Sequence, residues 1–158
     1  MKKMPENKPR KATRIILCFL YFFELVLCAV PFYGYLKNGK LIVDSVFATI
    51  SRIGSNNSNL TPLNIFIPLS FIFIIIPIIA FFVLVFDKQT NIKNIVSLIF
   101  SVICIILLIF VVGFNYMNIG AIFALILYVN ILQVTILSMM SRLIKSNNTV
   151  NELSKEKV

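Results

Sequence analysis

The sequence predicts an all-α, polytopic membrane protein: an antiparallel bundle of four transmembrane helices with a small extracytoplasmic loop element. Three observations support this fold class. Hydrophobic residues make up 59% of the 158 residues and charged residues 13%, against roughly 45–50% and 25% in ordinary soluble domains. The hydrophobic excess is gathered into four blocks. One of these blocks, from Thr61 to Phe86, carries no charge at all.

The uncharged block predicts a helix over residues 62–86. From Leu63 to Phe86 such a helix rises about 36 Å, which is enough to cross a hydrocarbon core of about 30 Å with some tilt. A helix that is apolar on every side is not stable in water unless a much larger protein surrounds it. Pro68 and Pro77 lie inside the block, and prolines are tolerated in transmembrane helices because neighbouring groups satisfy the freed carbonyls. The chain therefore belongs in a lipid bilayer.

The amino end predicts a basic tail followed by a first helix. Residues 1–14 hold six basic residues and one acid and are expected to be a disordered cytoplasmic tail. Residues 15–35 form the helix. A basic start before an apolar run also fits a signal peptide, but this run is longer than usual and Ala29-Val30-Pro31 is a poor cleavage site. We therefore expect an uncleaved helix that Pro31 kinks or ends.

Residues 36–61 form the predicted outer loop. The pair Asn38-Gly39 between two short apolar runs predicts a small β-hairpin. Asp44 is then placed to cap a short amphipathic helix, which Gly54 ends. The apolar positions of this helix share one face, which suits the bilayer surface or the end of the bundle; they are Val43, Val46, Phe47, Ile50 and Ile53.

The carboxyl half predicts two further helices, over residues 95–114 and 121–140, joined by a short uncharged turn. With the first two helices they form one transmembrane domain, residues 15–140. The polar residues 141–158 are expected to continue the last helix for about one turn and then to be a disordered cytoplasmic tail. The domain therefore has two tails and one substantial loop.

The positions of Lys and Arg predict the orientation. The amino tail has six of them, the 87–94 turn two and the carboxyl tail four, whereas the 36–60 loop has three. Cytoplasmic loops of membrane proteins carry the excess of basic residues. We expect both termini to be cytoplasmic in the cell membrane and the loop to be outside.

Glu24 is the one ionisable side chain inside a predicted membrane helix. A charged group at this depth costs at least a few kcal/mol, so such residues usually face the bundle interior and often have a role. Asn130 and Gln133 lie at a similar depth in the last helix and share a helix face. We expect Glu24 to hydrogen-bond one of them across a contact between the first and last helices. This intramembrane polar cluster is a packing clasp or a proton or cation site; the remaining alternative is that Glu24 contacts a different protein.

Two further groups of residues are expected to make contacts. Small side chains allow helix backbones to approach closely and predict a packing seam: Ser97, Ser101, Cys104, Gly120 and Ala124. The outer amphipathic helix offers a possible contact to another protein through Phe47, Ile50 and Arg52.

Composition and motifs argue against several functions. The sequence has no His and no Trp, and its cysteines Cys18, Cys28 and Cys104 lack metal-binding spacing. We therefore predict no metal, no cofactor and, with no catalytic motif present, no enzymatic activity. The net charge of +9 follows from the flanks of the membrane helices, so we expect no nucleic acid partner.

The predicted function is that of an accessory or scaffold subunit, which associates with itself or with another membrane protein in the bilayer. A small ion or proton channel or transporter subunit that uses Glu24 is the first alternative. A membrane immunity or resistance protein is the second. The order of basic tail, helix, modest outer loop and three closely spaced helices resembles many small four-helix membrane proteins of Gram-positive bacteria, but this is a likeness of layout and brings no site with it.

Overall fold

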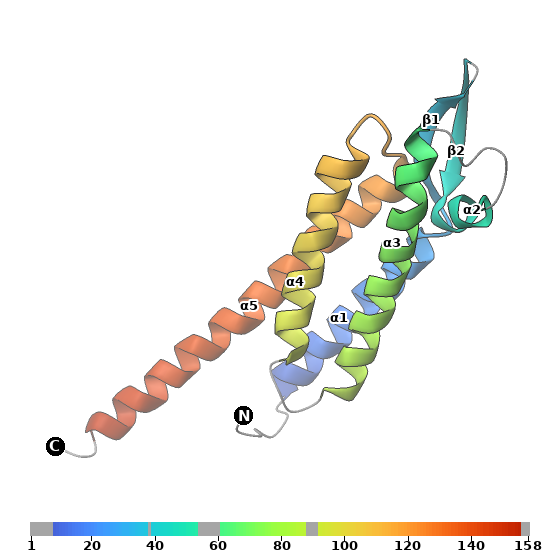
Figure 1. Cartoon of the computed structure of the whole chain (residues 1–158). Coiled ribbons are helices and arrows are strands. Elements are labelled where there is room, and N and C mark those ends of the chain that lie inside the picture. Colours follow the sequence, from blue (N-terminus) through green and yellow to red (C-terminus); the bar gives the residue numbers. More distant parts are fainter. Residues whose placement is uncertain (1–7, 38, 54–60, 88–91, 156–158) are drawn as a thin grey trace.

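The computed structural model describes residues 8–37, 39–53, 61–87 and 92–155. Most of them are helical, and one hairpin stands at one end of the molecule (Figure 1). The elements in chain order are α1 (Lys8–Leu27), β1 (Pro31–Lys37), β2 (Lys40–Ser45), α2 (Val46–Ser51), α3 (Thr61–Phe86), α4 (Ile92–Ile106), the π-helix η1 (Leu107–Val112) and α5 (Ile119–Lys155).

Three of the helices are long and apolar enough to cross a membrane. The candidate spans are Asn64–Phe86, Ile92–Val112 and Ile119–Ser141. Helix α1 is not among them, because its first two turns are basic and only its second half is apolar. The helices therefore fit a multi-pass membrane protein.

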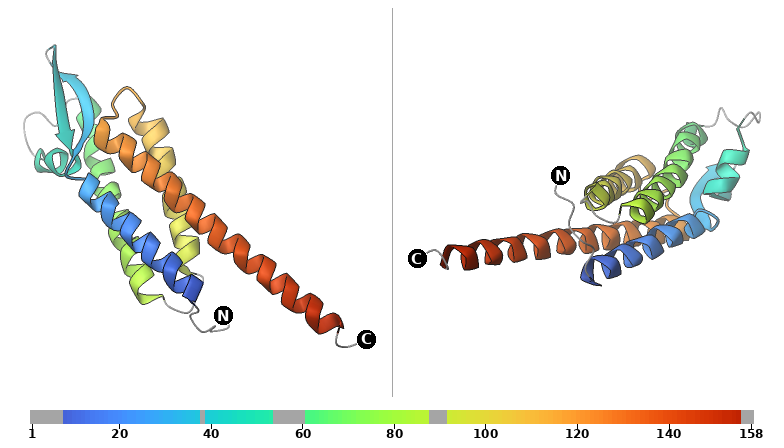
Figure 2. Two further views of the ribbon diagram at one scale, coloured as in Figure 1. Left: turned by 180° about the vertical axis from the view of Figure 1, so that it is seen from behind. Right: turned by 90° about the horizontal axis from the view of Figure 1, so that it is seen from below.

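The four long helices lie side by side. Helix α1 packs against α3 and α5, and α4 packs against the same two helices. Figures 1 and 2 show the start of α1, the end of α3, the start of α4 and the carboxyl end of α5 at one end, with the hairpin at the other. Helix α5 continues well beyond its neighbours. The buried residues of the helices converge between them.

Helix α1 differs from the predicted 15–35 at both ends. It begins at Lys8, inside the tail that we expected to be disordered, and residues 1–7 lie outside the described part. It ends at Leu27, and Pro31 then opens β1. Since a residue before proline avoids the helical region, the helix does not continue through Val30. The residues from Pro31 onward pair in β1 instead.

The remaining helices are longer than predicted. Helix α3 matches the expected 62–86 within one residue and contains Pro68 and Pro77 as expected. Helix α4 begins three residues early and passes into the π-helix, which ends at Gly113 with φ of 72°. Helix α5 runs to Lys155, so most of the predicted disordered tail is helical; residues 156–158 lie outside the described part.

The predicted hairpin is confirmed, which adds a small sheet to the all-α expectation. Strands β1 and β2 pair antiparallel from Lys37↔Lys40 to Pro31↔Ser45, and Gly39 takes a φ of 75° in the turn. The other edge of β1 is occupied by the connection before α5. There the Gly34 amide donates to the Tyr116 carbonyl at 2.8 Å, and the Asn118 amide donates to the Phe32 carbonyl at 2.9 Å.

Aromatic side chains attach the hairpin to the helices. Tyr33 of β1 stacks on Phe66 of α3 with ring centroids 4.5 Å apart, and Phe32 lies 5.4 Å from Phe73 one to two turns further along. The Ser70 hydroxyl donates to the Phe66 carbonyl at 2.7 Å and lies 3.3 Å from the Tyr33 hydroxyl. Pairs of this kind add about 0.5–1.5 kcal/mol beyond burial, so the hairpin has a fixed position on α3.

Candidate functional site

Glu24 is buried at the centre of the helix assembly. Its side chain is 2% exposed, and its Oε1 atom has no hydrogen-bond partner among the described residues. A buried polar atom without a partner costs about 1–3 kcal/mol. The Glu24 carboxyl, which has this unpartnered atom among the described residues, is therefore expected to destabilise the fold. A destabilising group at a buried position is a candidate for a functional role.

The predicted partners of Glu24 are not beside it. Asn130 is exposed and donates its amide to the Ile126 carbonyl of its own helix at 2.8 Å, and Gln133 is also exposed. The predicted clasp is therefore not formed. Similar depth along two helices, on which the prediction rested, does not fix the direction in which a residue points around its helix. The inward stripe of α5 consists of Ala121, Ala124, Tyr128, Ile131 and Thr135.

The side chains that do surround Glu24 come from three helices and from the turn after α1. Tyr21 lies on α1, Cys28 directly follows its last residue, Cys104 lies on α4 and Tyr128 on α5, all close enough to interact electrostatically with the carboxyl. Tyr128 is fully buried, and the sequence analysis missed it. Its position seven residues after Ala121 and four after Ala124 places it on the same helix face, which was the available signal.

A row of polar side chains extends from Glu24 along the inner face of α4. The Tyr21 hydroxyl of α1 donates to the Ser97 carbonyl at 3.5 Å, and the Asn94 amide lies 3.4 Å from the Ser138 hydroxyl of α5. The Oγ atom of Ser97 and the Oδ1 atom of Asn94 are buried without a partner among the described residues. Buried polar atoms of this kind are the usual partners of internal water.

The residues of the predicted packing seam are all buried. Ser101 and Cys104 are fully enclosed, and Ser101 donates to the Leu98 carbonyl at 3.0 Å. Gly120 lies against the backbone of Pro31, where a β-carbon would come within 2.7 Å of the carbonyl oxygen. The close approach at Gly120 is therefore between a helix and the start of the hairpin, and no side chain fits there.

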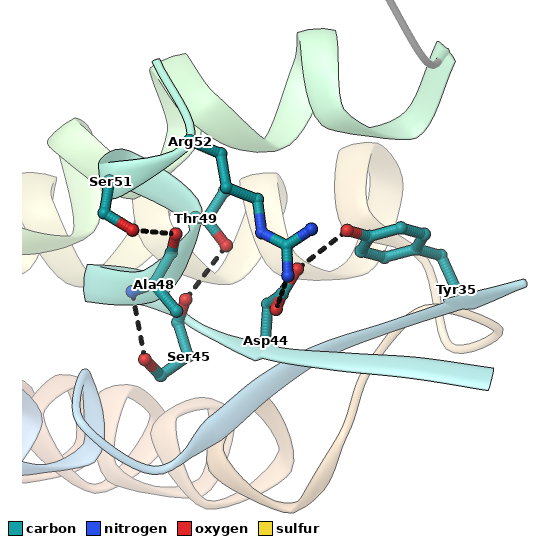
Figure 3. A network of polar contacts seen from close by, with 7 residues as sticks. All are labelled: Tyr35, Asp44, Ser45, Ala48, Thr49, Ser51 and Arg52. Atoms are coloured by element: carbon teal, nitrogen blue, oxygen red, sulfur yellow. Dashed lines mark hydrogen bonds and ion pairs between the residues drawn. The ribbon is translucent and has the colours of Figure 1, made fainter. Parts of the chain in front are cut away.

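A second polar group, Asp44, lies in the outer element (Figure 3). Its carboxylate accepts a hydrogen bond from the Tyr35 hydroxyl and forms an ion pair with Arg52, both at 2.7 Å. Burial, the hydrogen bond to Asp44 and the charge of Asp44 raise the pKa of Tyr35 to about 12. The prediction that Asp44 caps the outer helix is wrong: Ser45 caps α2, its hydroxyl accepting from the Ala48 amide at 3.1 Å.

The predicted outer contact residues are only partly accessible. Phe47 is 49% exposed, whereas Ile50 is half-buried and Arg52 is held by Asp44. The larger apolar surface lies on the hairpin. One face of the hairpin is covered by the rest of the molecule: Tyr33, Tyr35 and Asp44 are buried there, and Ile42 is half-buried. The opposite face presents Leu36, Leu41 and Val43, which are 73%, 67% and 41% exposed.

Within the described ranges, no group of three metal-ligating side chains lies together. Comparison of the chain with protein-family models, with curated proteins and with solved structures gave no match. The two features that remain as candidate sites are the buried carboxyl of Glu24 and the apolar face of the hairpin.

Proposed function

We propose that the chain is a non-enzymatic, four-span protein of the cell membrane that associates with a second copy of itself through the apolar hairpin face formed by Leu36, Leu41 and Val43. The observation that carries this proposal is the exposure of these three residues on a hairpin that projects beyond the ends of the helices (Figures 1 and 2). Apolar side chains on the membrane helices face lipid, but a projecting hairpin lies beyond the hydrocarbon. An exposed apolar patch in water marks an interaction surface.

In the proposed four-span arrangement the hairpin lies outside the cytoplasm. Helix α1, which packs against α3 and α5, supplies the fourth crossing in this proposal, so that the start of α1 and the far end of α5 lie on one side with the basic segments. The positive-inside rule then makes that side cytoplasmic. This orientation is supported by the distribution of Lys and Arg along the chain. It is also supported by the position of the start of α1 and the far end of α5 at the same end of the molecule (Figure 1).

The proposed partner of the apolar hairpin face is a second copy of the chain, because the hairpin is suited to pair with itself. Strand β1 has partners on both edges, whereas β2 pairs only with β1 among the described strands. Two β2 strands that pair antiparallel form a symmetric interface, which is the commonest kind in homodimers. The antiparallel direction also keeps the Lys40 side chains of the two copies apart, and it joins the two apolar faces into one.

The test is the mass of the purified protein in mild detergent, with crosslinking in native membranes as a second measurement. We expect a dimer for the wild type and a monomer for Leu36→Ser/Leu41→Ser. The matched control is Leu137→Ser, which changes an equally exposed leucine on α5. Val43→Cys in a Cys18→Ser background should give a crosslinked dimer on oxidation. A monomeric wild type without crosslinks would contradict self-association and leave the face to a different membrane protein.

A second candidate function, passage of protons or small cations, is favoured by the unpartnered Oε1 atom of Glu24. The row of Tyr21, Ser97 and Asn94 continues from it toward the cytoplasmic end. The test is proton and cation flux into liposomes that contain the wild type or Glu24→Gln. Flux that the substitution abolishes would support transport. No flux in either protein, with Glu24→Gln at least as stable as the wild type, would exclude it.

A further inference from the structure

An apolar groove runs between α1 and α3 at their cytoplasmic ends, in the proposed orientation. Its volume is about 580 Å³, within the range of about 300–1,000 Å³ that is typical of small-molecule sites. Aromatic rings from both helices form its walls. The residues that line it are Arg14, Ile15, Cys18, Phe19, Phe22, Phe81, Leu84 and Val85.

The charge in this groove is confined to one end. Among the described residues of the lining, Arg14 is the only charged one, and its Nη1 atom donates to the Val85 carbonyl at 3.5 Å, in the last turn of α3. The guanidinium therefore lies level with the end of a membrane span, where lipid headgroups begin. Lys11 precedes it by three residues, so the two cations share a helix face, and Lys11 is exposed.

Two aromatic rings of the lining, Phe19 and Phe22, are exposed and would face hydrocarbon in the proposed membrane placement. Cys18, Phe19 and Phe22 continue the Arg14 face of α1 into the membrane-buried half of the helix. A polar metabolite would lose its hydration there without gaining partners. An acyl chain has the right chemistry, and an attached phosphate would lie beside Arg14. Basic pockets between transmembrane helices on the cytoplasmic side are suited to anionic lipid headgroups.

We infer that this groove binds one anionic phospholipid of the cytoplasmic leaflet, with an acyl chain between Phe19, Phe22 and Phe81 and the phosphate at Arg14 and Lys11. The inference rests on the membrane placement of α1 and α3, and it is independent of whether the hairpin self-associates.

The experiment titrates the full-length protein in detergent with phosphatidylglycerol or with phosphatidylcholine of the same acyl chains. Native mass spectrometry counts bound lipids, and thermal unfolding reports their effect on stability. For the wild type we expect one tightly held phosphatidylglycerol and at least a fivefold weaker phosphatidylcholine, a ratio that corresponds to about one cation. High salt should reduce the difference.

Four variants separate the parts of the site. Arg14→Gln should reduce the preference for phosphatidylglycerol by about fivefold, because only Lys11 remains beside the phosphate, and Arg14→Lys should retain most of the preference because it keeps the charge. Cys18→Phe fills the groove and should reduce binding of both lipids, whereas Lys40→Gln removes a cation from the hairpin and should change neither. Circular dichroism without added lipid verifies that each variant is folded.

Equal affinity of the wild type for the two lipids would overturn the inference, and so would an undiminished preference in Arg14→Gln. An unchanged lipid count in Cys18→Phe would show that the lipid is held elsewhere. None of these outcomes depends on the oligomeric state, so failure of the lipid site and failure of the proposed self-association are distinguishable.

Discussion

Gly120 at the start of α5 touches the Pro31 backbone so closely that a β-carbon there would lie 2.7 Å from the carbonyl oxygen. Pro31 is also the first residue of the hairpin, and the adjacent Asn118 amide bonds to the Phe32 carbonyl. The contact therefore sets the position of the hairpin on the last helix.

Replacement of Gly120 by alanine should destabilise the protein by about 1–3 kcal/mol, because the clash is with backbone that cannot rotate away. The control is Gly34→Ala, where the nearest atom to the new methyl group is the Asn118 Nδ2 at 3.6 Å, an ordinary contact. Thermal unfolding in detergent, followed by circular dichroism, measures both. Equal melting temperatures for Gly120→Ala and the wild type would contradict the close approach.

The helix cap at Ser45 should be worth about 1 kcal/mol locally. Ser45→Ala removes the acceptor of the Ala48 amide, so this amide should exchange its hydrogen about fivefold faster. Ser51→Ala is the matched control, because the exposed Ser51 hydroxyl only donates to the Ala48 carbonyl at the end of α2. Hydrogen exchange followed by mass spectrometry compares the two. If Ser51→Ala has the larger effect, the assignment of the cap is wrong.

The network of Tyr35, Asp44 and Arg52 predicts a dependence on alkaline pH. The pKa of Tyr35 is raised from 10 to about 12 by burial, by its hydrogen bond to Asp44 and by the charge of Asp44. The folded state favours the neutral phenol. Its contribution to stability is therefore complete below pH 10 and is lost as the pH rises toward 12.

Asp44→Asn should lower the pKa of Tyr35, because the amide oxygen still accepts the hydrogen bond but the negative charge is gone. The measurement is the ultraviolet absorbance of tyrosinate against pH, with Tyr35→Phe subtracted to isolate this residue among the five tyrosines. A wild-type Tyr35 that titrates near 10 would show that the phenol is not held by Asp44 in solution.

Removal of the Glu24 carboxyl should stabilise the fold. Glu24→Met keeps most of the side-chain volume and eliminates a buried atom without a partner, so we expect a gain of about 1–3 kcal/mol. Thr135→Val is the control, since its hydroxyl is buried but donates to the Ile131 carbonyl at 2.7 Å. A loss of stability in Glu24→Met would mean that the carboxyl is engaged in the native protein, for example by internal water.

The three candidate membrane spans were predictable because their signal is local. Composition alone located α3 within one residue, and the Asn38-Gly39 pair located the hairpin. Side-chain contacts between different helices and strands were not predictable in the same way. Asp44 was expected to cap a helix because of its position in the chain, but Arg52 and Tyr35 reach it in the folded structure.

For the candidate site, the sequence predicted the burial of Glu24 but not the residues around it. Burial of Glu24 followed from its position in an apolar segment, yet its neighbours depend on how α4 and α5 rotate about their axes. The amide at Asn130 can bond to its own helix, so its polarity did not require an inward position. The anchoring of the hairpin by Gly120 and by the 116–118 connection depends on contacts distant in sequence, which hydrophobic periodicity does not report.

Helix α5 is continuous from Ile119 to Lys155, whereas its membrane candidate ends at Ser141. The remaining turns extend about 20 Å at about 1.5 Å per residue. The described part of this extension contains no break, so for a given tilt of the span the far end is displaced in proportion to the length of the extension. A spin label or fluorophore near Lys155 would therefore magnify small reorientations of the membrane core into displacements that can be measured from the aqueous side.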